Sequence, residues 1–153
     1  MFIGTISCSG KCCIESNLPL TVCQNDEWRS CSILSIQNET LCRRYLSNFL
    51  TEAIVFGGLE PFEQFDEIYS FICTLRVQFK CYDPIVIYTG YYPREIFYAL
   101  KQLSEFDNII IKFGRYIPNQ PSKFDSLLGV TLASNNQYCT TAKEAYKQLV
   151  NSY

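Results

Sequence analysis

Residues 53–61, Ala-Ile-Val-Phe-Gly-Gly-Leu-Glu-Pro, decide the fold of this chain. The first four residues are apolar and include two β-branched side chains, as in a buried strand of a parallel sheet. Two glycines and a carboxylate follow soon after, so bare backbone amides and one acceptor stand where the strand ends. Open α/β sheets bind ligands at the carboxyl ends of their strands. The stretch therefore predicts a parallel α/β sheet with a small-molecule site at this edge.

The alternation of apolar runs with amphipathic stretches continues along the chain, which is typical of repeated βα units. We expect helices over residues 38 to about 49, with Asn38 as N-cap, and over residues 62–79, 93–103 and about 141–150. We expect five strands, at Phe2–Ser7, Ala53–Phe56, Ile85–Tyr88, Ile109–Phe113 and Val130–Ala133. Five strands cannot close an eight-stranded barrel. The prediction is an open partial (βα) barrel of about five mostly parallel strands, with helices on the outer face.

Length and composition limit the classes of protein. With 153 residues, 48% of them hydrophobic and 15% aromatic, the chain is expected to form one domain over residues 1–153. A net charge of −2 argues against a nucleic-acid or anionic-membrane partner, which would need a basic surface. No apolar run reaches the roughly 20 residues that span a bilayer, and the N-terminus lacks a secretory signal pattern. We therefore expect a cytoplasmic protein without nucleic-acid or membrane partners.

The chain has nine cysteines and no histidine. The lack of histidine excludes Ser-His-Asp and Cys-His catalysis and every histidine-ligated zinc site. In a reducing cytoplasm the cysteines are expected as thiols, and an odd number cannot all pair as disulfides. Acid–base chemistry would fall to carboxylates, tyrosines, lysines and thiols.

Two of these thiols follow the first expected strand with the spacing C-x₃-C. Cys8 and Cys12 enclose Ser9-Gly10-Lys11, and such polar neighbours do not favour burial in a core. Two thiolates at the end of a strand can face one soft metal centre. The sequence therefore predicts an iron–sulfur cluster held in part by Cys8 and Cys12.

Together with the glycine turn, this pair resembles the radical S-adenosylmethionine (SAM) superfamily, in particular its short 4Fe-4S single-cluster proteins and the activating proteins of anaerobic ribonucleotide reductase. Those proteins carry C-x₃-C-x₂-C after the first strand and a GGEP-like turn after the second. The likeness covers most of the chain through four motifs in the family's order, at residues 57–64, Ile87–Tyr91, Lys112–Tyr116 and Ser134–Gln137.

The sequence departs from the family at the third cysteine. Counted from Cys12, the third position is occupied by Glu15. Oxygen is a harder and poorer partner for an iron–sulfur cluster than thiolate. Cys13 is adjacent to Cys12, and Cys23 is followed by Gln24-Asn25 as in the family's C-Q-N variant. Glu15, Cys13 and Cys23 are therefore open alternatives for the third ligand.

The resemblance implies roles for further residues. The cluster would be held by Cys8, Cys12 and Glu15, with Cys13 or Cys23 as the alternative third ligand. In the family the glycine turn and its glutamate take the SAM amino group, and a lysine or arginine would bind the carboxylate. The implied SAM contacts, including those to adenosine, are Gly57, Gly58, Glu60, Thr89, Gly90, Lys112, Arg115 and Asn136.

The implied function is that of an iron–sulfur enzyme with a [4Fe-4S] cluster and SAM as cofactors, which cleaves SAM reductively to a 5′-deoxyadenosyl radical. The implied partner is a protein, in the family a glycyl-radical enzyme, and Trp28 with residues 18–37 is the predicted docking surface. One alternative is a degenerate relative that keeps the fold and SAM binding but has no complete cluster and no activity. Another is a structural zinc protein that uses Cys8, Cys12, Cys13 and Cys23.

Overall fold

The structure is a computed structural model that describes residues 1–152. Its centre is a five-stranded sheet with the order β1-β2-β3-β4-β7. The strands are β1 Phe2–Thr5, β2 Ile54–Gly58, β3 Ile85–Tyr88, β4 Ile109–Phe113 and β7 Tyr138–Thr141. The first four are parallel, and β7 pairs antiparallel with β4. The prediction of an α/β fold with about five mostly parallel strands is confirmed.

One predicted strand belongs to a different sheet. Residues 130–133 do not join the parallel sheet, because β6 (Val130–Leu132) pairs antiparallel with β5 (Lys123–Asp125) in a separate hairpin. The assignment of Val130–Ala133 to the main sheet is therefore wrong. The fifth place goes to β7, whose sequence Tyr-Cys-Thr-Thr is too polar to stand out as a buried strand.

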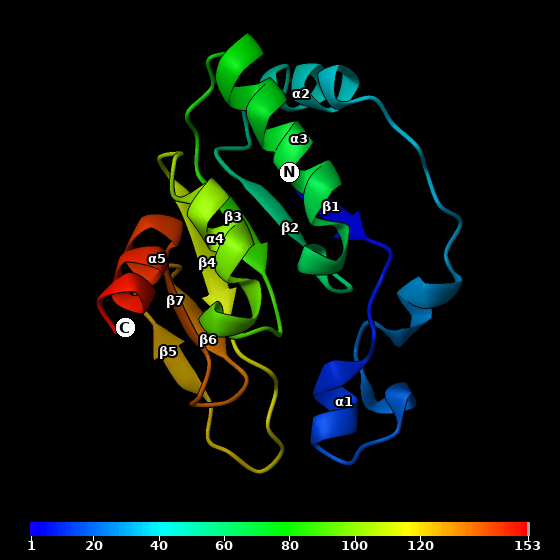
Figure 1. The fold of residues 1–153 in the computed structure, drawn as a ribbon. Helices are drawn as coiled ribbons and strands as arrows, with labels where there is room; N and C mark the ends of the chain where they lie inside the picture. The colour runs from blue at the N-terminus through cyan, green and yellow to red at the C-terminus, as the bar shows by residue number, and fades with distance from the viewer. Residues whose placement is uncertain (153) are drawn as a thin grey trace.

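Three helices lie over one face of the main sheet, as Figure 1 shows for α3, α4 and α5. The helices are α1 Lys11–Glu15, α2 Asn38–Leu46, α3 Phe65–Cys73, α4 Phe97–Leu103 and α5 Ala142–Asn151. Single 3₁₀ turns precede α3 and α4, at Pro61–Gln64 and Pro93–Ile96, and two more follow α1, at Leu20–Val22 and Asp26–Ser30. A π-helical turn, Thr74–Gln78, extends α3.

The four predicted helices are present, with changed ends. Asn38 is the first residue of α2 and does not cap it, because its amide donates to Ser70 Oγ at 3.0 Å. That helix ends at Leu46, three residues before the predicted end. The sequence did not predict α1, which is too short to show an apolar period.

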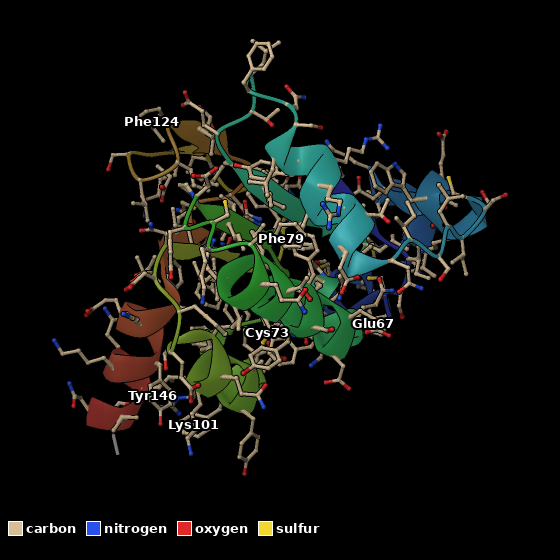
Figure 2. All side chains as sticks on the ribbon, turned by 90° about the horizontal axis from the view of Figure 1, so that it is seen from above. Glu67, Cys73, Phe79, Lys101, Phe124 and Tyr146 are labelled. Carbon is tan, nitrogen blue, oxygen red and sulfur yellow. The ribbon has the colours of Figure 1, made fainter. Side chains whose placement is uncertain are left out.

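The core lies between the sheet and the helices. Alternate residues of the central strands face it, namely Ile54, Phe56, Ile85, Ile87, Ile109, Ile111 and Phe113. Figure 2 shows the molecule from above, with Cys73 labelled on α3, Lys101 on α4 and Tyr146 on α5. Each large apolar side chain buried there contributes roughly 1.5–3 kcal/mol. The packed core fixes the strands and therefore the positions of the loops that leave their carboxyl ends.

Those loops gather at one edge of the sheet. α1 and the two 3₁₀ turns after it lie beyond this edge (Figure 1). In the part of the chain that the structure describes, no helix combines the length and the apolar character needed to cross a bilayer.

Candidate functional site

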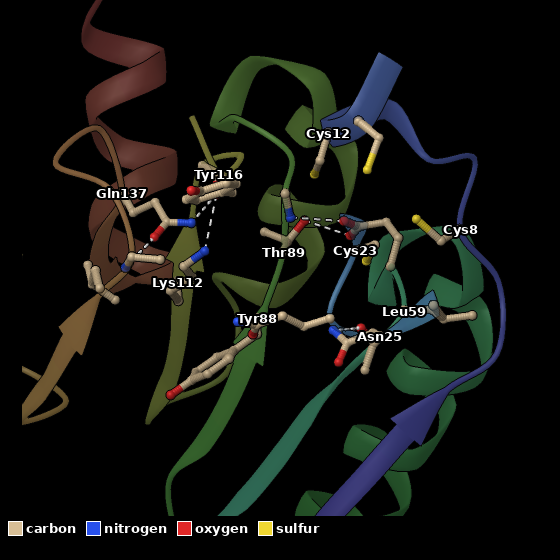
Figure 3. A pocket seen from close by; sticks show the side chains of 18 of the residues that line it. Cys8, Cys12, Cys23, Asn25, Leu59, Tyr88, Thr89, Lys112, Tyr116 and Gln137 are labelled. Carbon is tan, nitrogen blue, oxygen red and sulfur yellow. Dashed lines mark hydrogen bonds between the residues drawn. The ribbon is translucent and has the colours of Figure 1, made fainter. Parts of the chain in front are cut away.

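A cavity of about 750 Å³ opens at the carboxyl edge of the sheet. Its walls come from residues 8–13, here called the cysteine loop, from the ends of β2, β3 and β4, and from β6 (Figure 3). This volume is within the range of roughly 300–1,000 Å³ that is usual for small-molecule sites. Most of the predicted site residues line it: Cys8, Cys12, Cys13, Cys23, Gly58, Glu60, Thr89, Gly90 and Lys112.

Four free thiols share the cavity wall. Burial, then the neighbouring thiols Cys23 and Cys8, raises the pKa of Cys13. Burial, then Glu60 and Cys8, raises the pKa of Cys12 to about 11. Figure 3 shows Cys8, Cys12 and Cys23 around the same side of the cavity. Within residues 1–152, no three cysteine or acidic side chains are grouped closely enough to hold a metal ion.

The segment that carries Cys23 is fastened to the sheet and the cysteine loop. Asn25 Nδ2 donates to the carbonyl of Gly58 at 2.5 Å. Arg29 Nη1 donates to the carbonyl of Cys8 at 2.7 Å. The ring of Trp28 packs on the β1–β2 pair and leaves the side chain 37% exposed, so this predicted docking residue also has a packing role. Cys23 is thus held at the cavity although it is distant in sequence from Cys12.

Glu15 is not part of the cavity lining. Its Oε2 lies 2.9 Å from Arg115 Nε in an ion pair. As a third ligand, Glu15 would have to face Cys8 and Cys12, whereas in the structure its carboxylate is paired with Arg115. Of the three alternatives for a third ligand, the two cysteines line the cavity and the carboxylate does not.

Three predicted SAM contacts also lie outside the lining. Both terminal nitrogens of Arg115 donate to Glu95, at 2.9 and 2.6 Å. Asn136 Nδ2 donates to the carbonyl of Arg115 at 2.9 Å. Gly57 faces Phe2, whose ring would lie 3.2 Å from a Cβ at that glycine. Arg115 and Asn136 therefore contact other protein groups outside the cavity lining. Gly57 leaves space for the aromatic ring of Phe2.

Glu60 is 7% exposed and accepts three hydrogen bonds. They come from Thr89 Oγ1 at 2.6 Å, from the N–H of Gly90 at 2.9 Å and from the N–H of Phe62 at 3.1 Å. Burial raises the pKa of Glu60, and the three hydrogen bonds act in the opposite direction. The carboxylate joins the turn after β2 to the end of β3. A carboxylate has about four lone-pair sites, so one acceptor site remains for a ligand.

Lys112 supplies a positive charge to the same wall. Burial lowers the pKa of Lys112, while Cys12, Cys139 and Glu60 act in the opposite direction. Its Nζ donates to the carbonyl of Gly114 at 3.1 Å. Tyr88 and Tyr116 add aromatic surface to the lining. The arrangement suits a ligand with one ammonium, one carboxylate and one flat ring.

The contribution of β6 to the cavity wall was not predicted from the sequence. Residues 130–133 line the cavity, and Gln137 supports them by accepting the N–H of Ala133 on its Oε1 at 3.0 Å. A usable signal is the Asp125–Gly129 turn between two stretches of strand-forming residues, which is typical of a hairpin. Gly129 has a φ of +67°, as a tight turn of this kind often requires.

Compared with protein-family models, curated proteins and solved structures, the chain has no match in any of the three. Its function is therefore inferred from the residues of the cavity and from the sequence motifs.

Proposed function

We propose that this chain is a radical-SAM-type iron–sulfur protein that binds SAM in the cavity and cleaves it reductively. The observation that carries the proposal is that four thiols and the buried carboxylate of Glu60 line the same cavity. The proposal includes a sheet that curves as an open partial barrel, a single domain over residues 1–153 and a cytoplasmic location. The proposed target is a protein partner of the glycyl-radical enzyme class.

The donor set fits an iron–sulfur cluster in its chemistry. Thiolates are the ordinary ligands of such clusters, and soft donors are preferred over carboxylates. We propose Cys8, Cys12 and Cys23 as the ligands, because Glu15 is paired with Arg115 outside the cavity lining and Cys13 is buried, whereas Cys23 is partly exposed. The three thiols would have to move closer together when the cluster binds. When bound, a [4Fe-4S] cluster on three protein thiolates would pass one electron, drawn from an external reductant, to SAM, whose C5′–S bond would then split to give methionine and a 5′-deoxyadenosyl radical.

The remaining lining residues suit SAM itself. Glu60 has one acceptor site left for the ammonium group, and Lys112 offers a charge-assisted contact to the carboxylate. Tyr88 and Tyr116 offer faces on which adenine can stack. Gly58 also lines the cavity, and the place that its Cβ would take is filled by the ring of Trp28.

Anaerobic reconstitution with iron and sulfide tests the proposal. We expect about four irons per chain in the wild type and a near-complete loss in Cys8→Ala and in Cys23→Ala. The matched control is Cys31→Ala, which removes an exposed thiol outside the cavity lining and should keep the iron. A reconstituted wild-type protein with neither iron nor charge-transfer absorbance would contradict the proposal. Iron retained in Cys23→Ala but lost in Cys13→Ala would move the third ligand to Cys13.

A second candidate function is a SAM-fold binding protein that has lost its cluster. The contact that favours it is the ion pair between Glu15, at the family's third cysteine position, and Arg115. Calorimetry separates the two candidates: SAM binding by a protein that takes up no iron would support the second.

A further inference from the structure

Four side chains of alternating charge form an open chain of ion pairs beside the cysteine loop. Lys11 Nζ lies 2.5 Å from Glu95 Oε1, and Arg115 donates two hydrogen bonds to the same carboxylate. This chain of ion pairs ends at Glu15, whose Oε2 is 2.9 Å from Arg115 Nε. Lys11 and Glu15 are the first and last residues of α1. The Glu95–Arg115 pair therefore holds α1 at both ends.

The Glu95–Arg115 pair is rigidly placed. Arg115 is 3% exposed, and the centre of its guanidinium lies 4.9 Å from the ring centroid of Tyr92 and 5.8 Å from that of Tyr91. Glu95 Oε2 also accepts the N–H of Tyr92 at 2.8 Å. A planar guanidinium with two parallel hydrogen bonds and stacked aromatic rings has little freedom to move. This pair is a fixed support against which a weaker element can be oriented.

α1 is such a weaker element. It has five residues, follows Gly10 at φ +75° and has no side-chain cap. A helix of this length is not stable alone, so its contacts decide its orientation. Lys11 and Glu15 lie one turn apart on the same face. Their attachment to Glu95 and Arg115 leaves Cys12 against Gly90, where a Cβ would fall 2.6 Å from the Cys12 sulfur.

We propose that Arg115, acting with Glu95, is a positioning residue that sets the orientation of α1 and thereby presents Cys12 to the cavity. In this reading Arg115 does not bind the SAM carboxylate, although the sequence suggested that role. The purpose of the arrangement, thiol ligation, rests on the proposed function. The geometry itself can be tested in protein that holds no metal.

The test is residue-resolved alkylation of the reduced, metal-free protein with iodoacetamide, followed by mass spectrometry. We expect Arg115→Gln to raise the alkylation rate of Cys12 at least tenfold, because α1 is released from one support. A nearby cation favours the reactive thiolate, so loss of the charge alone would slow the reaction. The matched control is Lys143→Gln, which removes the surface ion pair with Asp107 and should leave the rate of Cys12 unchanged.

Milder variants separate positioning from general destabilisation. Glu15→Gln keeps the Glu95–Arg115 pair and should still raise the rate of Cys12, at least threefold. Lys11→Arg should keep the wild-type rate, whereas Lys11→Gln should raise it. Cys42 is fully buried in the core and should stay protected in every variant.

Two results would overturn the inference. One is a wild-type rate at Cys12 in Arg115→Gln, and the other is a rise at Cys42 that matches the rise at Cys12, since this would mean that the whole fold has loosened. Failure of the wild type to take up iron would count against the proposed function alone, because the alkylation experiment needs no metal.

Discussion

The indole ring of Trp28 lies directly over Gly58: a Cβ built on that glycine would fall 2.6 Å from two ring carbons. Gly4 on the neighbouring strand is even closer to the same ring. Phe2 meets Trp28 edge to face, with ring centroids 5.6 Å apart. Two glycines on paired strands thus form a flat seat for the indole, and this seat holds the segment that carries Cys23.

Gly4→Ala should displace Trp28 from this seat. The added methyl overlaps the ring, and overpacking of this kind costs typically 1–3 kcal/mol. Gly4 does not have a positive φ, so the substitution brings no backbone strain of its own. Trp28 is the one tryptophan in the sequence, so its fluorescence reports the seat directly. We expect emission at longer wavelength as the ring becomes more exposed to water.

The control is Gly129→Ala. Gly129 has a φ of +67° and nothing within 4 Å of its Cβ position. Alanine there costs about 1 kcal/mol of backbone strain but should leave the emission of Trp28 unchanged. An unshifted spectrum in Gly4→Ala would contradict the seat. Gly58→Val would be a poor test of ligand binding, since it strains a residue at φ +93° and overlaps Trp28 before any ligand is considered.

Glu95 should make the stability of the protein depend on pH in the acid range. Hydrogen bonding by Arg115, then by Lys11, lowers the pKa of Glu95 from 4.5 to about 2. The folded-state value lies below the unfolded one, so the contribution is present above pH 4.5 and is lost as the pH falls toward 2. Because the carboxylate is partly exposed, we expect about 1–2 kcal/mol after screening by solvent.

Urea unfolding at several pH values between 5 and 2.5 measures this contribution. Glu95→Gln should be less stable than the wild type at pH 5, and the difference should shrink toward pH 2.5. Glu67→Gln, which removes an exposed carboxylate on α3, is the control and should follow the wild type. A constant gap between Glu95→Gln and the wild type over this range would show that ionisation of Glu95 is not the cause.

Glu60→Gln should destabilise the fold even without a ligand. The carboxylate accepts from Thr89, Gly90 and Phe62 on two oxygens, whereas an amide offers one oxygen and an NH₂ group that cannot accept. At least one buried donor then loses its partner, which costs roughly 1–3 kcal/mol. The measurement is the free energy of unfolding in urea, with Glu63→Gln as a neighbouring carboxylate variant for comparison. Unchanged stability would mean that Glu60 is held only loosely.

Local sequence patterns predicted the parallel core of the fold well. The runs at β2, β3 and β4 are short, mainly apolar and rich in β-branched residues, which is the pattern of parallel strands in an α/β protein. β7 was not predicted, because it is polar and partly exposed, so only its tertiary pairing with β4 identifies it as a strand. Residues 130–132 do not belong to the main sheet, because they pair with β5 in a separate hairpin.

The candidate site was predictable where one motif sits at one strand end, as with Cys8, Glu60 and Thr89-Gly90. The site was not predictable where a polar side chain can bind either a ligand or another side chain of the protein. Arg115 and Glu15 have the right chemistry for a site, but their charges are satisfied by an ion pair that joins residues 100 positions apart, like the hydrogen bond between Ser16 and Tyr116 next to it. Such pairings depend on the folded geometry and leave no local pattern.

Lys112→Met should weaken SAM binding without loosening the fold. Lys112 contributes the positive charge on the cavity wall, and a charge-assisted contact to a carboxylate is lost with it. We expect at least a tenfold rise in Kd, about 1.4 kcal/mol. The carbonyl of Gly114 keeps a donor, because Gln137 Nε2 also donates to it at 3.1 Å, and methionine keeps most of the apolar volume of the stem. Calorimetry with Lys101→Met as the control, an exposed lysine on α4, makes the comparison. Equal affinity in Lys112→Met and the control would show that the ligand carboxylate does not lie at Lys112.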